Sequence, residues 1–210
     1  MTTDRVRLVA IVPAAGASRR MGQPKLLLPL GGRTVVARLI RAMDHPDVAD
    51  VLVVIRPDDE ALATEVRAHG GVVVRPDVAP ADMKASVRLG VADMVWKYAA
   101  DDVAGWLLIP ADHPVVDGEL VGRVIDHWQT TRSKVLVPTC GGRRGHPTLF
   151  SRQVADVLDM IPDDSGLNWL VAELDDEVEE IELGREELLL DLDTPEQYDA
   201  VRRRFEESGG

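Results

Sequence analysis

The residues best suited to chemistry lie in segment 14–25, which reads Ala-Ala-Gly-Ala-Ser-Arg-Arg-Met-Gly-Gln-Pro-Lys. Its small residues would let backbone N–H groups approach a ligand closely, and such groups form concave anion-binding sites. Its cations, Arg19, Arg20 and Lys25, would supply positive charge where phosphate oxygens lie. An ordinary loop with solvated arginines is the alternative for any single residue. Taken together, the segment predicts a triphosphate-binding loop, although the Walker A and GxGxxG spacings are both absent.

The elements that would position this loop follow from the spacing of apolar residues. The β-branched run Leu8–Val12 is typical of a buried parallel strand, and it ends at Pro13. Alternating apolar runs and amphipathic segments along the rest of the chain predict a parallel sheet with right-handed crossovers. We expect strands at residues 8–12, 51–55, 72–74, 106–109, 135–137 and 178–183, and helices after Thr34, at 60–69, after Asp82, at 117–128, at 167–174 and after Thr194.

Asp112 directly follows the fourth expected strand. In a doubly wound sheet the first and fourth strands are neighbours, and ligands bind beyond their carboxyl ends. Segment 14–25 follows the first strand, so it should meet Asp112 at one point of the sheet edge. An aspartate in this position can also cap a loop. The convergence favours a Mg²⁺ ligand, because hard cations prefer carboxylate oxygens.

The overall composition limits the class of protein and its partners. The chain has 210 residues, of which 45% are hydrophobic and 29% charged, which is typical of one globular domain, here expected to span residues 1–210. A net charge of −12 argues against nucleic acid, while local basic loops suit a small anionic ligand. No apolar run reaches the length of a membrane span and Met1–Arg7 is polar, so we expect a cytoplasmic protein without a membrane partner. The single cysteine, Cys140, excludes an internal disulfide and a cysteine-based zinc site.

Several motifs, in order along the chain, resemble the MobA-like nucleotidyltransferases and within them are closest to the molybdenum cofactor cytidylyltransferases. The opening Ala-Ala-Gly-x-Ser-x-Arg-Met-Gly-x-x-Lys comes first, and Asp112-His113-Pro114 resembles the metal-binding Asp-x-Pro motif of that family. Gly145-His146-Pro147 resembles the Gly-His-Pro motif near its acceptor substrate, and Asp193 precedes Thr-Pro-Glu. One departure is that Asp82 stands where Gly-Met-x-x-Ser motifs have glycine, although Met83 and Ser86 match.

The resemblance implies an α/β fold of three layers, with a Rossmann-like doubly wound, mostly parallel sheet and an additional antiparallel strand or hairpin. It implies transfer of a nucleotidyl group from a nucleoside triphosphate to a phosphorylated acceptor, with release of pyrophosphate. The expected site residues fall into four groups. They are Ala14, Ala15, Gly16, Ser18, Met21, Gly22, Lys25 and Ser86 for the nucleotide; Lys25, Arg19 or Arg20, and Asp112 for catalysis; Asp112 and Asp193 for Mg²⁺; and Arg143, Arg144, Gly145 and His146 for the acceptor.

Two of these assignments leave alternatives. One alternative gives Asp193 no role beyond the start of the last helix, where Thr194 and Gln197 form a capping box. Asp191 is a second candidate for the metal ligand. His146 can be structural, and the two adjacent arginines are what favour recognition of an acceptor phosphate. We expect no general base, because an acceptor phosphate is already largely a dianion at neutral pH and the sequence indicates no histidine–carboxylate pairing.

The substrates follow from the resemblance as well. Ala14-Ala15-Gly16-Ala17-Ser18 favours CTP over GTP, and the closest subfamily implies molybdopterin as acceptor and an apo-molybdoenzyme or its chaperone as partner. A related enzyme using another nucleoside triphosphate and a sugar phosphate or phosphocholine is the first alternative. A molybdenum cofactor carrier without catalysis is another. An NAD-dependent oxidoreductase is disfavoured, because the second strand runs into Arg56-Pro57 rather than ending in an acidic residue.

Overall fold

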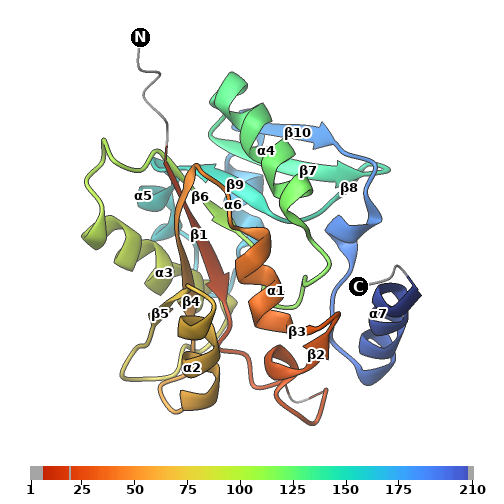
Figure 1. Cartoon of the computed structure of the whole chain (residues 1–210). Helices are drawn as coiled ribbons and strands as arrows, with labels where there is room; N and C mark the ends of the chain where they lie inside the picture. Colours follow the sequence, from red (N-terminus) through yellow and green to blue (C-terminus); the bar gives the residue numbers. More distant parts are fainter. Residues whose placement is uncertain (1–6, 19, 208–210) are drawn as a thin grey trace.

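The strand β1, Leu8–Pro13, organises the molecule because all of its residues are buried. Leu8 and Val12 face one hydrophobic core, and Val9 and Ile11 face another on the opposite side of the strand. A strand that is buried on both faces needs covering helices on both sides, and Figure 1 shows β1 in the middle of a sheet between two groups of helices. The alternation predicted from the sequence therefore becomes a three-layer α/β/α arrangement.

The sheet is mixed and mostly parallel. Its other strands are β4 (Val48–Val54), β5 (Val72–Val74), β6 (Gly105–Leu108), β7 (Val135–Cys140), β8 (Arg143–Arg144), β9 (Thr148–Ser151) and β10 (Val178–Glu182). Hydrogen bonding orders them β10–β7–β9–β6–β1–β4–β5, with β8 paired to the end of β7. β1 is parallel to β4 and β6, whereas β9 is antiparallel to β6 and β7. The predicted contact of the first and fourth strands and the additional antiparallel strand and hairpin are thus confirmed.

Helices cover both faces of this sheet. The computed structural model describes residues 7–18 and 20–207, and its helices are α1 (Val35–Ala42), α2 (Glu60–Ala68), α3 (Met83–Lys97), α4 (Gly118–Thr131), α5 (Val154–Leu158), α6 (Asn168–Glu173) and α7 (Pro195–Glu207). α1, α2 and α4 pack into the core that contains Leu8, while α3, α5 and α6 pack into the core that contains Val9. Within the described residues, none of the helices is both long enough and apolar enough to cross a membrane.

We call residues 14–24, which follow β1, the first loop. The last helix, α7, lies beside the segment that follows this loop (Figure 1). That segment consists of the short 3₁₀ turn η1 (Lys25–Leu27) and the two-stranded hairpin β2 (Pro29–Leu30) and β3 (Arg33–Thr34). The hydroxyl group of Tyr198 on α7 donates to the carbonyl oxygen of Pro29, and the guanidinium of Arg38 lies 3.8 Å from the centre of the Phe205 ring. These contacts bring the start of α7 close to Lys25.

Two helix caps that were predicted from the sequence are present in the structure. The hydroxyl of Thr34 accepts from the N–H of Ala37, and Thr194 and Gln197 form the predicted reciprocal capping box of α7. β4 begins at Val48, three residues before the predicted start. The prediction missed these residues because they are only half-buried and polar Asp50 interrupts the apolar pattern. Two further 3₁₀ turns, η2 (Asp175–Glu177) and η3 (Glu186–Leu189), flank β10 and were not predicted.

Candidate active site

A cavity of about 520 Å³ lies where the strands β1, β4 and β6 end. The first loop forms one wall and the start of α3 forms the opposite wall. The predicted site residues that line it are Ala14, Ala15, Gly16, Ser18, Lys25, Ser86 and Asp112. Residues far apart in the sequence therefore surround one space, as expected for the switch point of a doubly wound sheet.

The first loop turns sharply after β1. Ser18 has a φ of 46°, and its carbonyl oxygen accepts from the N–H groups of Met21 and Gly22 at 3.1 and 3.2 Å. Met21 is buried, so its side chain anchors the loop to the protein and does not line the main cavity. Gly22, with a φ of 66°, lines a smaller adjoining cavity together with Gly16. Met21 and Gly22, which were both predicted to bind the nucleotide, thus shape the loop.

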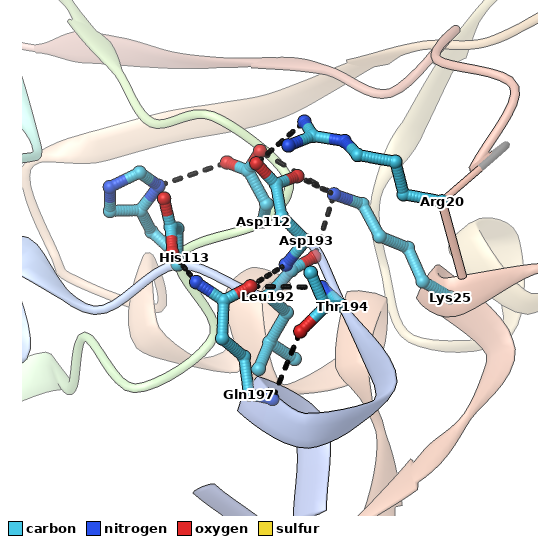
Figure 2. A network of polar contacts seen from close by, with 9 residues as sticks. Arg20, Lys25, Asp112, His113, Leu192, Asp193, Thr194 and Gln197 are labelled. Carbon is cyan, nitrogen blue, oxygen red and sulfur yellow. Dashed lines mark hydrogen bonds and ion pairs between the residues drawn. The ribbon is translucent and has the colours of Figure 1, made fainter. Parts of the chain in front are cut away.

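Lys25 is the centre of the polar site (Figure 2). Its ammonium nitrogen Nζ donates to the carbonyl oxygen of Leu192 at 2.8 Å and lies 3.2 Å from Asp193 Oδ1 and 3.5 Å from Asp112 Oδ2. The Lys25 side chain is only 15% exposed, and both aspartates are less than a quarter exposed. Opposite charges therefore hold together Lys25, which follows β1, Asp112, which follows β6, and Asp193, which precedes α7, in a partly desolvated space.

Arg20 adds a second cation. Its Nη2 donates to Asp193 Oδ2 at 2.7 Å, although the Arg20 side chain is 71% exposed. An exposed pair of this kind contributes little to stability, so Arg20 is free to exchange Asp193 for an anionic ligand at small cost. Arg19, the other predicted cation of this loop, lies outside the described residues.

Asp112 carries an unusually acidic carboxyl group. Burial opposes its ionisation, but the hydrogen bond from His113 and the charge of Lys25 outweigh that effect and lower the pKa of Asp112 to about 2. The ring Nδ1 of His113 lies 3.0 Å from Asp112 Oδ1. The expectation of no histidine–carboxylate pairing was therefore wrong. The two side chains are adjacent in sequence at a turn after β6, where neighbouring side chains can face each other.

The aspartates fit a metal ion that arrives with a phosphate ligand. The part of the chain that the structure describes has no group of three or more His, Cys, Asp or Glu side chains that could hold a metal ion. Among the carboxylates of that described part, those of Asp112 and Asp193 contact Lys25. Two carboxylates without further protein ligands match the way Mg²⁺ is usually bound beside substrate phosphates. Asp191, the other candidate, is instead held by the side chain of Gln197.

The predicted acceptor loop, residues 143–146, divides into two parts. At one end Gly145 packs against Leu188, and the ring of His146 meets that of His113 edge-on at 4.8 Å between ring centres. Burial, with a smaller contribution from His113, lowers the pKa of His146 to about 4. This end therefore contacts the residues beside Asp112, and its histidine is neutral at physiological pH.

The arginine end of that loop lies elsewhere. Arg144 donates to Glu180 at 2.7 Å, and the carboxylate of Glu182 accepts from the N–H groups of Gly141 and Gly142. Arg143 lines a separate cavity of about 510 Å³ between the β7–β8 hairpin and α7. The structure thus brings His146 close to Asp112, whereas Arg143 and Arg144 do not line the nucleotide cavity.

Two charged residues that line the cavity were not among the predicted site residues. Arg56 follows the carboxyl end of β4 and lines the cavity, and Asp82 caps α3 by accepting from the N–H of Ala85 at 2.7 Å. The rule that picked Asp112, a polar residue directly after a buried strand, also applies to Arg56. Ser86, which was predicted, lies beside Asp82, and its hydroxyl donates to the Asp82 carbonyl oxygen at 3.1 Å.

A glycine-containing loop, a lysine and two converging aspartates lie together at the carboxyl edge of a doubly wound sheet, which is the arrangement expected of a nucleotide-binding protein. The chain belongs to the family of MobA-like NTP transferase domains, whose model matches residues 10–178. It is 30% identical over 176 residues to the bifunctional protein GlmU of Nocardia farcinica, covering 81% of this chain and 32% of that protein. It is also 30% identical over 138 residues to 2-C-methyl-D-erythritol 4-phosphate cytidylyltransferase of Rhodococcus jostii, covering 65% of this chain and 58% of that enzyme.

A solved structure agrees with this assignment over nearly the whole chain. The crystal structure of Rv0371c from Mycobacterium tuberculosis in complex with manganese matches with a TM-score of 0.73 and 26% identity, covering 94% of this chain and 99% of that one. The curated relatives are longer, since the matched part is about one third of GlmU. Asp193 and α7 lie beyond the segment that the family model matches, so their place in the site comes from the structure.

Proposed function

We propose that this protein is a nucleotidyltransferase that transfers CMP from CTP to the phosphate of a small phosphorylated molecule. The observation that carries the proposal is the convergence of Lys25, Asp112 and Asp193, of which Lys25 and Asp112 line a cavity together with the first loop. The cytidylyltransferase among the relatives supports CTP, and its name supports a sugar-alcohol phosphate as the kind of acceptor. A sugar phosphate or phosphocholine would likewise react through an oxygen of its phosphate group.

The reaction requires positioning and charge neutralisation more than proton transfer. A phosphate oxygen of the acceptor attacks the α-phosphorus of CTP, the new O–P bond forms, and the bond to the β-phosphate oxygen breaks to release pyrophosphate. A bound divalent metal, Mg²⁺ or Mn²⁺, would neutralise phosphate charge beside Asp112 and Asp193. Lys25 and Arg20 would stabilise the growing charge on the leaving pyrophosphate, since both already contact carboxylate oxygens there.

The neighbouring groups suit this chemistry. Asp112 stays ionised at neutral pH because its pKa is lowered to about 2, so it can hold a cation throughout the reaction. The acceptor phosphate, with a second pKa of about 6, needs no base to become a nucleophile. His113 then has the role of holding Asp112 rather than of taking a proton from the acceptor.

Molybdopterin is a second candidate acceptor. The specific observation in its favour is the loop sequence Ala14-Ala15-Gly16-Ala17-Ser18, which resembles that of the molybdenum cofactor cytidylyltransferases. An apo-molybdoenzyme or its chaperone would be a partner only in this case. The relatives reported above, none of which is named for molybdopterin, favour the broader proposal.

A matrix of substrates tests both proposals. Pyrophosphate release is measured for CTP, GTP, UTP and ATP, each with 2-C-methyl-D-erythritol 4-phosphate, a hexose 1-phosphate, phosphocholine and molybdopterin, in Mg²⁺ and in Mn²⁺. We expect CTP to give the highest kcat/KM with one phosphorylated acceptor.

The matched control is Asp112→Asn, which keeps the size of the side chain but loses the charge that a hard cation prefers. We expect it to keep the fold, with a cooperative melting transition, and to lose turnover by roughly a hundredfold or more, as when a charge-stabilising group is removed. Wild-type kcat in this variant would remove Asp112 from the mechanism. Release with GTP alone would overturn the choice of base, and no release with any pair would overturn the activity.

A further inference from the structure

The segment 191–194 presents Asp193 to the site, and one side chain holds most of it. The amide oxygen Oε1 of Gln197 accepts from the backbone N–H of Asp193 at 2.8 Å and of Thr194 at 2.9 Å. Its amide nitrogen Nε2 donates to Asp191 Oδ1 at 2.7 Å. Figure 2 shows Gln197 reaching back from the first turn of α7 to this segment. The capping-box pattern predicts at most the bond to a backbone N–H, so the contact with Asp191 is additional.

The three bonds leave one way to orient the amide. Two N–H donors require an oxygen on one side of it, and a carboxylate requires an N–H donor on the other. Gln197 therefore distinguishes the two aspartates of the Asp-Leu-Asp sequence. It binds the carboxylate of Asp191, and it holds only the backbone of Asp193, whose carboxylate is left to face Lys25 and Arg20.

The middle of the segment is fixed separately. The N–H of Leu192 donates to the carbonyl oxygen of Asp112 at 2.8 Å, and the Leu192 side chain is 1% exposed. The carbonyl oxygen of Leu192 accepts from Lys25. Leu192 thus fixes segment 191–194 against the turn that carries Asp112, while Gln197 holds the backbone of the next residue, Asp193.

We infer that Gln197 is a positioning residue that holds Asp193 in a metal-binding orientation and removes Asp191 from competition. The inference rests on the proposed function, because it assumes that Asp193 is a metal ligand there. Groups that hold a metal ligand in place typically affect metal affinity by about 10- to 100-fold when they are changed. Gln197 does not line the nucleotide cavity, so it would act on the metal through Asp193.

The experiment measures Mn²⁺ binding by electron paramagnetic resonance, with and without a non-hydrolysable CTP analogue, at mildly alkaline pH. In Gln197→Glu the new carboxylate still accepts from Asp193 and Thr194 but repels Asp191. We expect roughly tenfold weaker Mn²⁺ binding or more, and a fall in kcat larger than the rise in KM for CTP. Gln197→Met, which removes all three bonds without adding charge, should weaken binding similarly.

Three further variants separate the roles. Asp191→Asn should bind Mn²⁺ like the wild type, because its amide oxygen still accepts from Gln197. The double variant Gln197→Glu with Asp191→Asn should recover most of the affinity, because the amide introduced at position 191 can donate to the new carboxylate. Thr194→Ala removes the other half of the capping box and serves as the control for helix destabilisation. We expect little change in its Mn²⁺ affinity.

The outcomes distinguish this inference from the proposed function. If Asp193→Asn leaves Mn²⁺ affinity unchanged, the proposed metal site is wrong. If Asp193→Asn weakens binding but Gln197→Glu and Gln197→Met do not, only the positioning role is wrong. Loss of binding in Asp191→Asn would make Asp191 a ligand and overturn the discrimination between the two aspartates.

Discussion

At the scale of single residues, Lys25 shares one ammonium group among three oxygens. Leu192 supplies a carbonyl oxygen, and Asp112 and Asp193 supply carboxylate oxygens within 3.5 Å. The ammonium therefore neutralises the same carboxylates that would bind a metal. A metal ion and a triphosphate that arrive together would let the carboxylates turn to the metal and the ammonium to the phosphates. Nucleotide and metal should then bind cooperatively, as two ligands linked by one exchange of partners.

This exchange predicts opposite effects of Lys25→Met on two measurements. We expect kcat to fall by roughly 10²- to 10³-fold, because a cation aimed at developing charge has been removed. We expect Mn²⁺ to bind the nucleotide-free variant more tightly, by about threefold to tenfold, since a repulsion of roughly 1 kcal/mol between cations is relieved. Titration with Mn²⁺ and steady-state kinetics check the two effects. Lys25→Arg keeps the charge and is the control, and weaker Mn²⁺ binding in Lys25→Met would contradict the exchange.

At the scale of elements, the close approach of α3 to β1 sets the far wall of the cavity. A Cβ on Gly90 would lie 2.6 Å from Cγ2 of Ile11 and 3.3 Å from Cγ2 of Val54. The absence of a side chain thus lets the helix lie against both strands. The first turn of the same helix carries Met83 and Ser86 to the cavity. Packing in the middle of α3 and ligand contact at its start are therefore linked.

Two helical glycines give a matched test of this packing. Gly90→Ala should destabilise the protein by about 1–3 kcal/mol, because the added methyl group overpacks the core. Gly122→Ala on α4 has its nearest atoms, in the His45 ring, at 3.9 Å. It should stabilise the protein by about 0.5–1 kcal/mol through helix propensity. Urea denaturation of both variants gives the two free energies, and a Gly90→Ala variant more stable than the wild type would show that helix propensity, not packing, decides at Gly90.

The elements also show which structure is readable from a sequence. Strands with unbroken apolar runs and helices with capping residues were predicted, because both signals are local. α5 was missed, since its five residues, Val154–Leu158, are too few to establish a period. β9 was expected only as an extra strand, and its insertion between β6 and β7 depends on pairing across the sheet rather than on its own four residues.

At the scale of the whole molecule, the site is assembled by topology. The meeting of Lys25 and Asp112 could be predicted from the rule for doubly wound sheets, because both follow neighbouring parallel strands. Asp193 could be placed there only by resemblance, since α7 reaches the site by docking on the β2–β3 hairpin. Arg144 is placed by its ion pair with Glu180 on β10, and Arg143 lines a cavity that it shares with α7; a single sequence reveals neither arrangement.

The stability of the whole chain should depend on pH through His146, which lies where the acceptor loop packs against the turn after β6. Burial, aided by His113, lowers the pKa of His146 from 6.5 to about 4. Between these values the unfolded chain binds a proton that the folded protein does not. The free energy of unfolding therefore falls as the pH is lowered through this window, by up to about 3 kcal/mol at roughly 1.4 kcal/mol per pKa unit.

His146→Phe isolates this contribution, because the ring that packs against His113 is kept while the titrating group is removed. The Nδ1 atom of His146 is buried and has no hydrogen-bond partner in the part of the chain that the structure describes, so its loss should cost little, whereas loss of the ring's hydrogen bond with the Leu108 backbone lowers the stability across the whole pH range. We expect the variant to gain stability relative to the wild type as the pH falls from about 6.5 toward 4, with a constant difference above that window. Urea denaturation across this range measures the difference. A difference that does not change with pH would mean that His146 is accessible to protons in the folded protein, and that its end of the acceptor loop opens to solvent.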